Sequence, residues 1–243
     1  LRTARENLDD LVDPGSFLEF GAFAVAAQRN RRDYEELQLE TSADGILTGF
    51  CNINEDEVGE DNSHAAAIIY DYSVLAGSQG FFHHQKLDRI CEKAEEFSLP
   101  VVIFTEGGGG RPGDTDVTTQ IAGLHIPSFS TWARLTGKCL KIAVNNGYCF
   151  AGNAVLFGCS DFMIATKQSW IGMAGPAMIE GGGLGVYDPK EIGPAEEQYK
   201  NGVLDYLAED EKEATFIAKK LLSYFQGNLS CLLYTSPSPR DLA

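Results

Sequence analysis

A run of four glycines, Gly107–Gly110, is the part of this sequence best suited to chemistry on a bound ligand. It lies within FTEGGGGRPG at residues 104–113, after the apolar run VVIF and directly before Arg111-Pro112. Glycine contributes no packing and loses more backbone entropy on folding than any other residue. Four in succession therefore predict a turn in which the backbone itself comes very close to a ligand.

Other glycine motifs fit this run less well. Gly108, Gly110 and Gly113 satisfy the G-x-G-x-x-G spacing of a dinucleotide-binding turn, but Pro112 lacks an N–H that a pyrophosphate would use. The sequence contains neither the G-x-x-x-x-G-K-[ST] of a P-loop nor the G-x-S-x-G of a hydrolase elbow. A flexible surface loop would explain one or two glycines, but it would not explain two further bare turns downstream.

The two further turns are CFAGNA at 149–154 and GMAGPA at 172–177. Like the glycine run, CFAGNA follows a stretch typical of a buried strand. The carboxyl ends of parallel strands meet at one edge of a sheet, so two neighbouring turns can each direct a backbone N–H at the same point. A pair of converging N–H donors is an oxyanion hole, which stabilises negative charge on a substrate oxygen. Neither the glycine run nor CFAGNA contains His, Lys or Ser, in agreement with chemistry that the backbone performs.

The elements that must position these turns follow from the hydrophobic periodicity. Short continuous apolar runs predict strands, at 46–53, 65–73, 101–104, 141–147 and 161–166. Apolar residues three and four positions apart predict helices, at 3–13, 80–97, 126–137, 151–160 and 212–225. Strands and helices alternate in the second half, so we expect a parallel α/β core.

Two of these elements carry more specific expectations. The acidic insert NEDEVGEDNS at 54–63 separates two predicted strands, and its run of charges predicts a solvated hairpin loop. In the last helix, the apolar residues that repeat on one side are Phe216, Ile217, Leu221 and Phe225.

Several stretches, taken together, resemble one known family. GYCFAGNAVLFGCSDFMIAT at 147–166 resembles the second oxyanion-hole segment of the crotonase superfamily. The whole is similar to the carboxyltransferase of biotin-dependent acyl-CoA carboxylases, through ARENLDDLVDPGSFLEFG, DGILTGFCNIN, AAAIIYDYSVLAGSQG, EGGGGRPGDTD and IGMAGPAMIEGGGLG. The resemblance covers about residues 1–227. It implies an α/β, crotonase-like fold of repeated ββα units, and it implies that 1–227 is the N-terminal half of a carboxyltransferase whose homologous second half lies outside this chain.

The resemblance also assigns roles to the turns. The N–H groups of Gly110 and Gly152, the latter helped by Asn153, would hold the thioester oxygen of an acyl-CoA as it becomes an enolate. The family uses a ureido nitrogen of biotin as the base, so the protein need not supply one. Arg111 would neutralise a phosphate or carboxylate, or it would form a salt bridge within the protein. The expected substrate contacts are Gly108, Gly109, Arg111, Ala151, Gly175 and Pro176.

One position distinguishes this chain from the hydratases of the superfamily. Their catalytic Glu follows the second turn by a few residues, where this chain has Val155, which cannot transfer protons. Glu106 and Glu180 stand beside bare turns and are alternative acid–base groups, although we expect them to cap helices or face solvent. His83 and His84 lie in a predicted helix, where we expect them at the surface or at the edge of the core.

The resemblance implies partners as well as a fold. Biotin would be carried on a partner domain or subunit, alongside a biotin carboxylase component, and the full carboxyltransferase would be a homo-oligomer. No metal is expected in this part of the protein. Three other functions stay open: a biotin-linked decarboxylase that runs the same half-reaction backwards, a crotonase-type isomerase or hydrolase, and a non-catalytic subunit that binds thioesters.

Composition limits the kinds of partner and the cellular compartment that we expect for this protein. Lys and Arg number 19 against 35 Asp and Glu, a net charge of −16, which argues against a nucleic-acid partner. No apolar run is long enough to span a bilayer, and no signal peptide is visible. The six cysteines include no C-x-x-C pair, so we expect buried reduced thiols in a cytoplasmic protein.

Both ends of the chain look non-native. The chain opens at Leu1 without a Met, already within a helical pattern. Residues 228–243 lose the hydrophobic periodicity of the last helix, and the stretch from about Cys231 is rich in Ser and Pro and resembles translated adaptor sequence. We therefore expect 228–243 to be a disordered or non-native tail.

Overall fold

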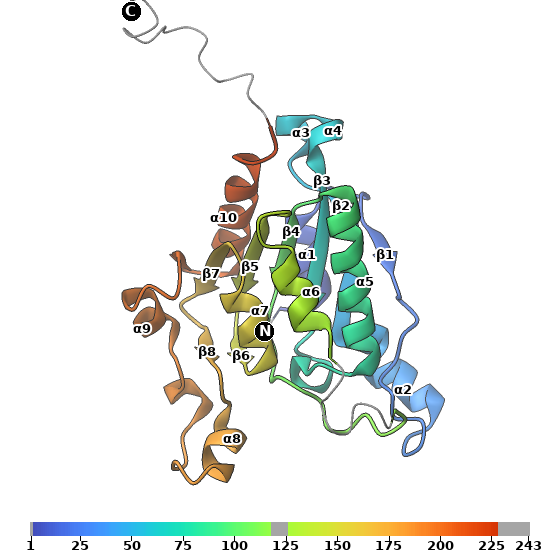
Figure 1. Cartoon of the computed structure of the whole chain (residues 1–243), viewed down its shortest axis with the longest axis vertical. Helices are drawn as coiled ribbons and strands as arrows, with labels where there is room; N and C mark the ends of the chain where they lie inside the picture. Colours follow the sequence, from blue (N-terminus) through green and yellow to red (C-terminus); the bar gives the residue numbers. More distant parts are fainter. Residues whose placement is uncertain (1, 118–125, 228–243) are drawn as a thin grey trace, which may run out of the picture.

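A seven-stranded sheet forms the centre of the computed structural model, which describes residues 2–117 and 126–227 (Figure 1). Its strands lie in the order β1-β2-β3-β4-β5-β7-β9. Their bounds are β1 Leu18–Phe20, β2 Ile46–Asn52, β3 His64–Tyr70, β4 Val101–Phe104, β5 Lys141–Asn145, β7 Phe162–Thr166 and β9 Tyr206–Ala208. A second sheet pairs β6 (Tyr148–Phe150) with β8 (Trp170–Gly172) in parallel.

The central sheet changes strand direction near one edge. β1, β2 and β3 are antiparallel neighbours, whereas β3, β4, β5, β7 and β9 run parallel. Every residue of β4 and of β5 is buried, as a strand covered on both faces requires. The predicted parallel α/β core is confirmed. Because β4 and β5 are paired in parallel, the turns that follow them leave the same edge of the sheet.

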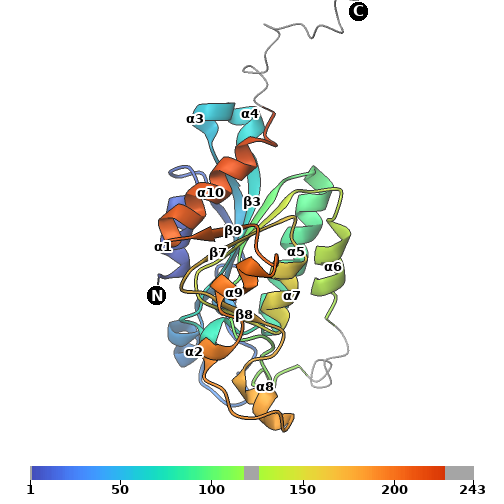
Figure 2. The same ribbon diagram turned by 90° about the vertical axis from the view of Figure 1, so that its left-hand side faces the viewer.

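Two layers of helices cover the sheet (Figure 2). α5 (Phe81–Phe97), α6 (Ser128–Arg134) and α7 (Gly152–Gly158) lie on one face, and α1 (Ala4–Leu11) and α10 (Glu211–Ser223) lie on the other. Each layer packs on the sheet through its own apolar cluster. The remaining helices are α2 (Tyr34–Glu40), α3 (Glu55–Val58), α4 (Glu60–Ser63), α8 (Pro176–Gly181) and α9 (Ala195–Lys200), with 3₁₀ turns η1 (Ser42–Gly45), η2 (Leu75–Gly77) and η4 (Pro189–Glu191).

Local sequence explains where the covering helices begin and which side they bury. α1 begins at a capping box, in which Thr3 and Glu6 satisfy each other's backbone N–H groups. α5 buries Leu87, Ile90 and Ala94, which recur at three- and four-residue steps on one face. These agreements between local signal and observed structure confirm the predicted helices.

The prediction of a solvated hairpin loop at 54–63 is correct in part: the segment joins the antiparallel strands β2 and β3 and most of it is exposed, but it is not an irregular loop. The segment forms α3 and α4 instead, and it is attached to the end of α10. The Asn54 amide donates to Lys219 O at 2.8 Å and to Gln226 Oε1 at 3.0 Å. These hydrogen bonds fix the segment to α10, while its charged residues Asp56, Glu57, Glu60 and Asp61 stay exposed to water.

The predicted apolar side of the last helix is also partly wrong. Phe216 is 62% exposed and Phe225 57% exposed. The buried residues of α10 include Ala214 and Ala218, which were not predicted, and Leu221, which was. Small side chains let the helix approach the sheet closely. Phe216 lies outside this contact, while the ring of Phe225 lies 5.9 Å from that of Phe162 in β7, centroid to centroid.

Other sequence expectations have mixed outcomes. Four cysteines are buried as predicted, but Cys159 is exposed. The tail at 228–243, with Cys231, lies outside the described residues. Within 2–117 and 126–227, no helix has both the length and the apolar character needed to cross a bilayer, and no three metal-binding side chains are grouped around one point.

Candidate active site

The glycine run forms a turn that is bonded on both sides to other parts of the chain. The N–H of Gly107 donates to Tyr148 O at 2.7 Å, and its carbonyl accepts from Phe150 N at 2.9 Å, which joins the turn to β6. The N–H of Gly108 donates to Ala76 O in η2 at 3.0 Å. The turn is therefore a fixed part of the structure and not a flexible surface loop.

Two of the four glycines leave no room for a side chain. A Cβ on Gly107 would collide with the carbonyl oxygen of Gly77 and with the amide of Asn153. Gly109 has a φ of +92°, and a Cβ there would lie 2.7 Å from the Cβ of Ala151. Glycine is thus required first of all because this turn packs directly against the start of α7.

The second bare turn, at the start of α7, holds the backbone in an unusual conformation. Ala151 has a φ of 51° and a ψ of −119°, which residues other than glycine rarely adopt. Its N–H donates to Gly172 O at 3.0 Å. In the third turn, Gly175 lies against the ring of Phe150, and Pro176 begins α8. The structure therefore places all three bare turns next to one another.

Among the residues that the structure describes, two backbone donors in these turns are unused. These are the N–H groups of Gly110 and Gly152, which donate no hydrogen bond to any other described residue. The next N–H along, that of Arg111, donates to Gln79 O at 3.0 Å. The nitrogen of Gly152 lies 3.7 Å from the point where a Cβ on Gly109 would stand. Unused donors in two adjoining turns are what an oxyanion hole needs.

The side chain of Asn153 fastens the first turn to the second. It is fully buried. Its Oδ1 accepts from Gly109 N at 3.0 Å, while its Nδ2 donates to Thr105 O at 3.1 Å and to Gly77 O at 3.4 Å. Since its polar atoms are bonded within the protein, the observed geometry is that of a residue that positions the two turns.

Arg111, which ends the glycine run, is in a buried salt bridge. Its side chain is 4% exposed, it pairs with Asp44, and its Nη1 lies 3.6 Å from an oxygen of Asp114. It also donates to Ser78 Oγ at 3.1 Å and to Ser78 O at 2.6 Å. Asp44 was not predicted as a site residue. The sequence indicates only a turn there, through the Asp-Gly pair at 44–45, in which both residues have a positive φ.

A cavity of 730 Å³ opens beside the first turn. Its lining includes Arg31, Arg111 and the ion pair of Arg32 with Glu36, together with Ala76 of η2. Ala76 is the residue whose carbonyl accepts from Gly108, so the cavity adjoins the glycine turn. Guanidinium groups around a cavity can bind an anionic group such as a phosphate.

The family model of the carboxyl transferase domain matches residues 1–239. The chain belongs to the carboxyl transferase domain family. It is 31% identical over 229 residues to the methylmalonyl-CoA carboxyltransferase 12S subunit of Propionibacterium freudenreichii subsp. shermanii, covering 93% of this chain and 41% of that protein. The chain thus spans about two-fifths of the length of the curated relatives it matches.

Solved structures agree with the family. A single-chain, multi-domain long-chain acyl-CoA carboxylase matches with a TM-score of 0.88 and 54% identity, over 93% of this chain and 22% of that one. Transcarboxylase 12S, described as a hexamer with hydrolysed methylmalonyl-CoA bound, matches with a TM-score of 0.76 and 31% identity, over 92% of this chain and 42% of that one. The predicted carboxyltransferase resemblance and the crotonase-like fold are confirmed.

In this carboxyl transferase domain, Glu106 is the carboxyl group next to the first turn. Only 4% of it is exposed. Its Oε1 accepts from Asn146 N at 2.9 Å, whereas its Oε2 is buried without a partner among the described residues. Burial raises the pKa of Glu106 to about 7. The expectation that Glu106 caps a helix or faces solvent is wrong, while Glu180 is exposed as expected.

The expectation that His83 and His84 lie at the surface or core edge is wrong, because the first turn of α5 is covered by η1 and α6. Both are buried. The backbone N–H of His83 donates to the Asp44 carboxylate at 2.7 Å, and His84 Nδ1 lies 2.8 Å from Ser128 Oγ. Burial lowers the pKa of both rings, that of His84 to about 4. Neutral, bonded rings here support the backbone that holds Asp44 and Arg111.

Proposed function

We propose that this chain binds an acyl-CoA and stabilises its thioester enolate while a carboxyl group is transferred from carboxybiotin. It would act as the N-terminal part of an acyl-CoA carboxylase carboxyltransferase. The observation that carries the proposal is that the N–H groups of Gly110 and Gly152 bond to no other residue in 2–117 and 126–227, and that the two turns that hold them are bonded to each other. Membership of the carboxyl transferase domain family supports it.

The chemistry explains why backbone donors are sufficient. For a new carbon–carbon bond to form, the α-carbon of the thioester must lose a proton, and negative charge then develops on the thioester oxygen. Gly110 and Gly152 would donate to that oxygen. Carboxybiotin, carried on another domain or subunit, supplies the carboxyl group and a basic nitrogen. Val155 removes the acid–base group that water addition would require.

The arginine-lined cavity is the proposed place for the anionic part of the acyl-CoA. It adjoins the first turn, so a thioester in that turn leaves the rest of the molecule close to Arg31. Arg31 is exposed, and within the described part of the chain its side chain makes one hydrogen bond, a long one of 3.4 Å to Gly113 O. Arg111 is already paired with Asp44, so it would contribute positive potential more than a new hydrogen bond.

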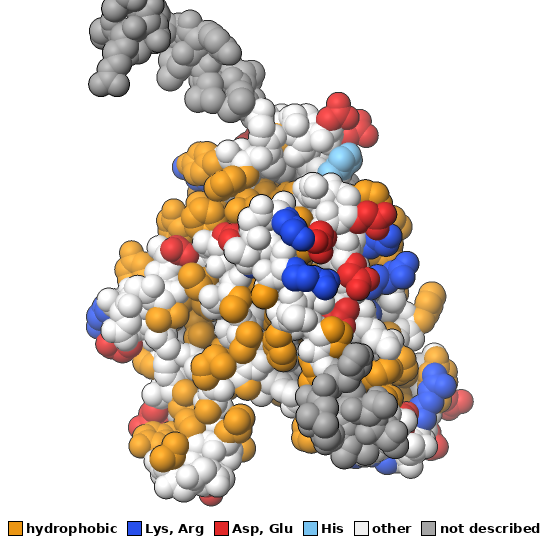
Figure 3. Space-filling model, viewed as in Figure 1, with side chains coloured by type: hydrophobic (Ala, Val, Ile, Leu, Met, Phe, Trp, Pro, Cys, Tyr) orange, Lys and Arg blue, Asp and Glu red, His pale blue; other side chains and the backbone are white. Residues whose placement is uncertain are grey.

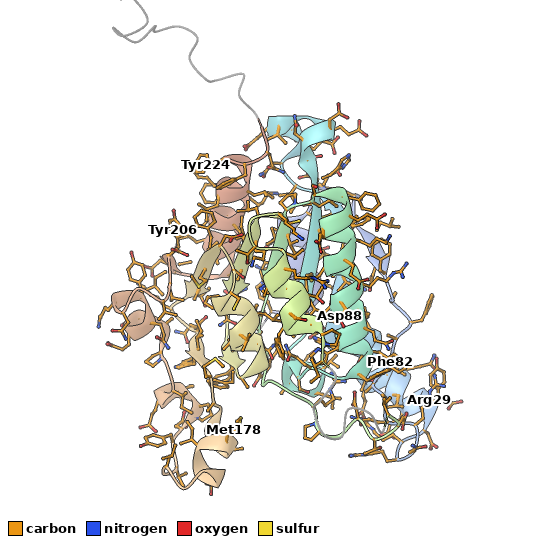
Figure 4. All side chains as sticks on the ribbon, viewed as in Figure 1. Arg29, Phe82, Asp88, Met178, Tyr206 and Tyr224 are labelled. Atoms are coloured by element: carbon orange, nitrogen blue, oxygen red, sulfur yellow. The ribbon has the colours of Figure 1, made fainter. Side chains whose placement is uncertain are left out.

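Exposed apolar side chains supply the proposed contact with a second carboxyltransferase half. Around α8, large apolar residues are exposed to solvent at the lower left of Figure 3, and Figure 4 marks one of them, Met178, beside this helix. These residues are Met173, Met178, Leu184, Val186 and Tyr187. A contiguous exposed apolar surface beside a site commonly marks a protein interface. We propose that the second carboxyltransferase half covers this apolar surface in a homo-oligomer. The homo-oligomer would also bind biotin carboxylase and biotin carrier components.

The thiols support a cytoplasmic location. Each of the five described cysteines is free, and four of them are buried. Unpaired thiols are usual where the surroundings are reducing.

The decisive experiment compares two substitutions of Gly110 in the complete carboxyltransferase, with its second half present. Gly110→Pro deletes the donor N–H, whereas Gly110→Ala keeps it and places a Cβ in open space. We expect Gly110→Pro to lower kcat for carboxyl transfer to acyl-CoA about 100- to 1000-fold, and Gly110→Ala to remain near the unsubstituted value. Circular dichroism would confirm that both proteins fold.

Several results would contradict the proposal. Undiminished turnover in a folded Gly110→Pro protein would remove this donor from the mechanism. Absence of carboxyl transfer in the unsubstituted complete protein, with decarboxylation instead, would favour the reverse half-reaction. Hydration of crotonyl-CoA by this chain alone would favour the hydratase class.

A further inference from the structure

Gln79 lies between the two bare turns and has no role in the function proposed so far. It follows η2 and precedes α5, and only 4% of it is exposed. Its N–H donates to Gly109 O at 2.7 Å, and its carbonyl accepts from Arg111 N at 3.0 Å. The backbone of Gln79 therefore flanks Gly110 on both sides and fixes the direction of the Gly110 N–H.

The side chain of Gln79 reaches from the first turn to the second. A Cβ placed on Gly152 would collide with Gln79 Oε1. The amide group thus occupies the space beside Gly152 that a side chain would otherwise fill. At its other end, Nε2 donates to the hydroxyl of Tyr70 at 2.9 Å. One polar side chain is consequently held next to both proposed oxyanion donors.

The amide can present either of its polar atoms to Gly152. A rotation of 180° about the last side-chain bond exchanges Oε1 and Nε2 without moving any other group. The contact with Tyr70 survives this rotation, because a phenol hydroxyl donates as well as accepts. Burial raises the pKa of Tyr70 above its usual value, so the hydroxyl keeps its proton and can donate to Oε1.

We propose that Gln79 is a third hydrogen-bond donor to the substrate oxygen, through Nε2, once an acyl-CoA occupies the turns. This inference rests on the proposed function and adds a side chain to a site assigned so far to backbone groups. As negative charge develops on the thioester oxygen, an amide N–H beside Gly152 gains more from the enolate than from the neutral thioester. After the rotation Tyr70 would hold the amide in place by donating its hydroxyl proton to Oε1.

The test uses the complete carboxyltransferase and three variants. Gln79→Met keeps the volume of the side chain and removes the donor. Gln79→Glu keeps the shape and can donate only when its carboxyl group is protonated. Gln226→Met is the matched control, because Gln226 is a buried glutamine hydrogen-bonded to Asn54 and Ile53, far along the chain on the α10 side.

We expect Gln79→Met to lower kcat about 10- to 100-fold with KM for acyl-CoA changed by less than about threefold. Relative to the unsubstituted enzyme at each pH, Gln79→Glu should recover activity as the pH is lowered. Gln226→Met should lower the melting temperature and leave kcat unchanged. A residue that only packs between the turns would change stability and KM and would give no such pH profile for the Glu variant.

The outcomes separate the two proposals. If the unsubstituted enzyme transfers carboxyl groups and Gly110→Pro is impaired, but Gln79→Met keeps full kcat, the role of Gln79 is wrong and the proposed function stands. Equal pH profiles for Gln79→Glu and the unsubstituted enzyme would also overturn it. If Gly110→Pro is unimpaired, the proposed function itself fails.

Discussion

Two stretches of this chain read almost alike and behave differently in the structure. Glu106 is followed by Gly107–Gly110, and Glu180 is followed by Gly181–Gly183. The first run is bonded to β6, η2 and α7, and side chains at Gly107 and Gly109 would collide with neighbouring atoms. Around the second run, a Cβ on Gly181 or on Gly183 would meet open space.

The two runs contain glycine for different physical reasons. In the second, α8 ends at Gly181, and Gly183 has a φ of +70°. The N–H of Gly183 donates to Glu180 O, and that of Leu184 donates to Ile179 O, so the segment is a helix end closed by a left-handed glycine. In the first run, glycine permits backbone packing. Composition alone therefore does not distinguish a site from the end of a surface helix.

The largest expected effect on stability comes from the buried salt bridge of Arg111, which directly follows the first run. Arg111→Met would leave Asp44 buried without its partner, since the pair is 4% and 0% exposed. We expect the free energy of unfolding of this chain to fall by about 3–5 kcal/mol, measured by chemical denaturation. Arg31→Met, at an exposed position, should change it by less than about 0.5 kcal/mol. If both substitutions change the free energy of unfolding by the same small amount, the first run does not depend on the Arg111–Asp44 salt bridge.

The carboxyl group before the first run should make stability depend on pH. Burial raises the pKa of Glu106 from 4.5 to about 7, so between these values the folded state holds a proton that the unfolded state releases. The free energy of unfolding then falls as the pH rises through that window, by an amount on the order of 3 kcal/mol. Glu106→Gln removes this dependence. The free energy of unfolding of Glu106→Gln, minus that of the unsubstituted chain, should therefore be larger at pH 8 than at pH 4.5. If the two free energies change with pH in parallel, the raised pKa of Glu106 is wrong.

A smaller effect is expected from filling the space at Gly107. Gly107→Ala forces a methyl group against the carbonyl oxygen of Gly77 and the Asn153 amide. Overpacking of this kind costs about 1–3 kcal/mol, which thermal unfolding would detect. In the complete enzyme, the displaced Asn153 should also release Gly109 and lower kcat. A stable, fully active Gly107→Ala protein would mean that the first run resembles the second after all.

The smallest effect, with the opposite sign, is expected in the second run. Gly181 is the last residue of α8, and a Cβ there meets nothing. Gly181→Ala should therefore raise the free energy of unfolding by about 0.5–1 kcal/mol through helix propensity and reduced freedom of the unfolded chain. A loss of stability or of subunit assembly would indicate that this run, too, is in close contact with another surface.

The sequence predicted most of the elements that dominate the core. β4 and β5 are continuous apolar runs, and α5 has a regular apolar face, so local pattern and burial agree. β6 and β8 were missed because each has only three residues and pairs across a gap in the sequence. The two short helices of the acidic insert were not predicted, because its attachment to Lys219 and Gln226 is a tertiary contact that periodicity cannot show.

The site was predicted in outline and not in its supporting side chains. The three bare turns were recognisable because each interrupts a regular pattern with small residues. Asp44, Gln79 and the burial of His83 were not, since each depends on which segments meet in space. A polar residue in a short connection, such as Gln79, belongs to no periodic pattern or motif from which its role could be predicted. The residues that fix the Gly110 N–H became visible only through their hydrogen bonds.

The order of strands in the sheet has a consequence for how the chain folds during synthesis. Neighbours from β1 to β9 follow the order of the sequence, so each new strand adds to the free edge left by the previous one. Helices α5, α6 and α7 can cover one face as soon as they emerge. The opposite face is covered by α1 and α10, the first and last of these helices to be made (Figure 2). The part of that face that α10 covers, over β5, β7 and β9, stays open to water, and to misassembly or chaperones, until residue 223 has left the ribosome.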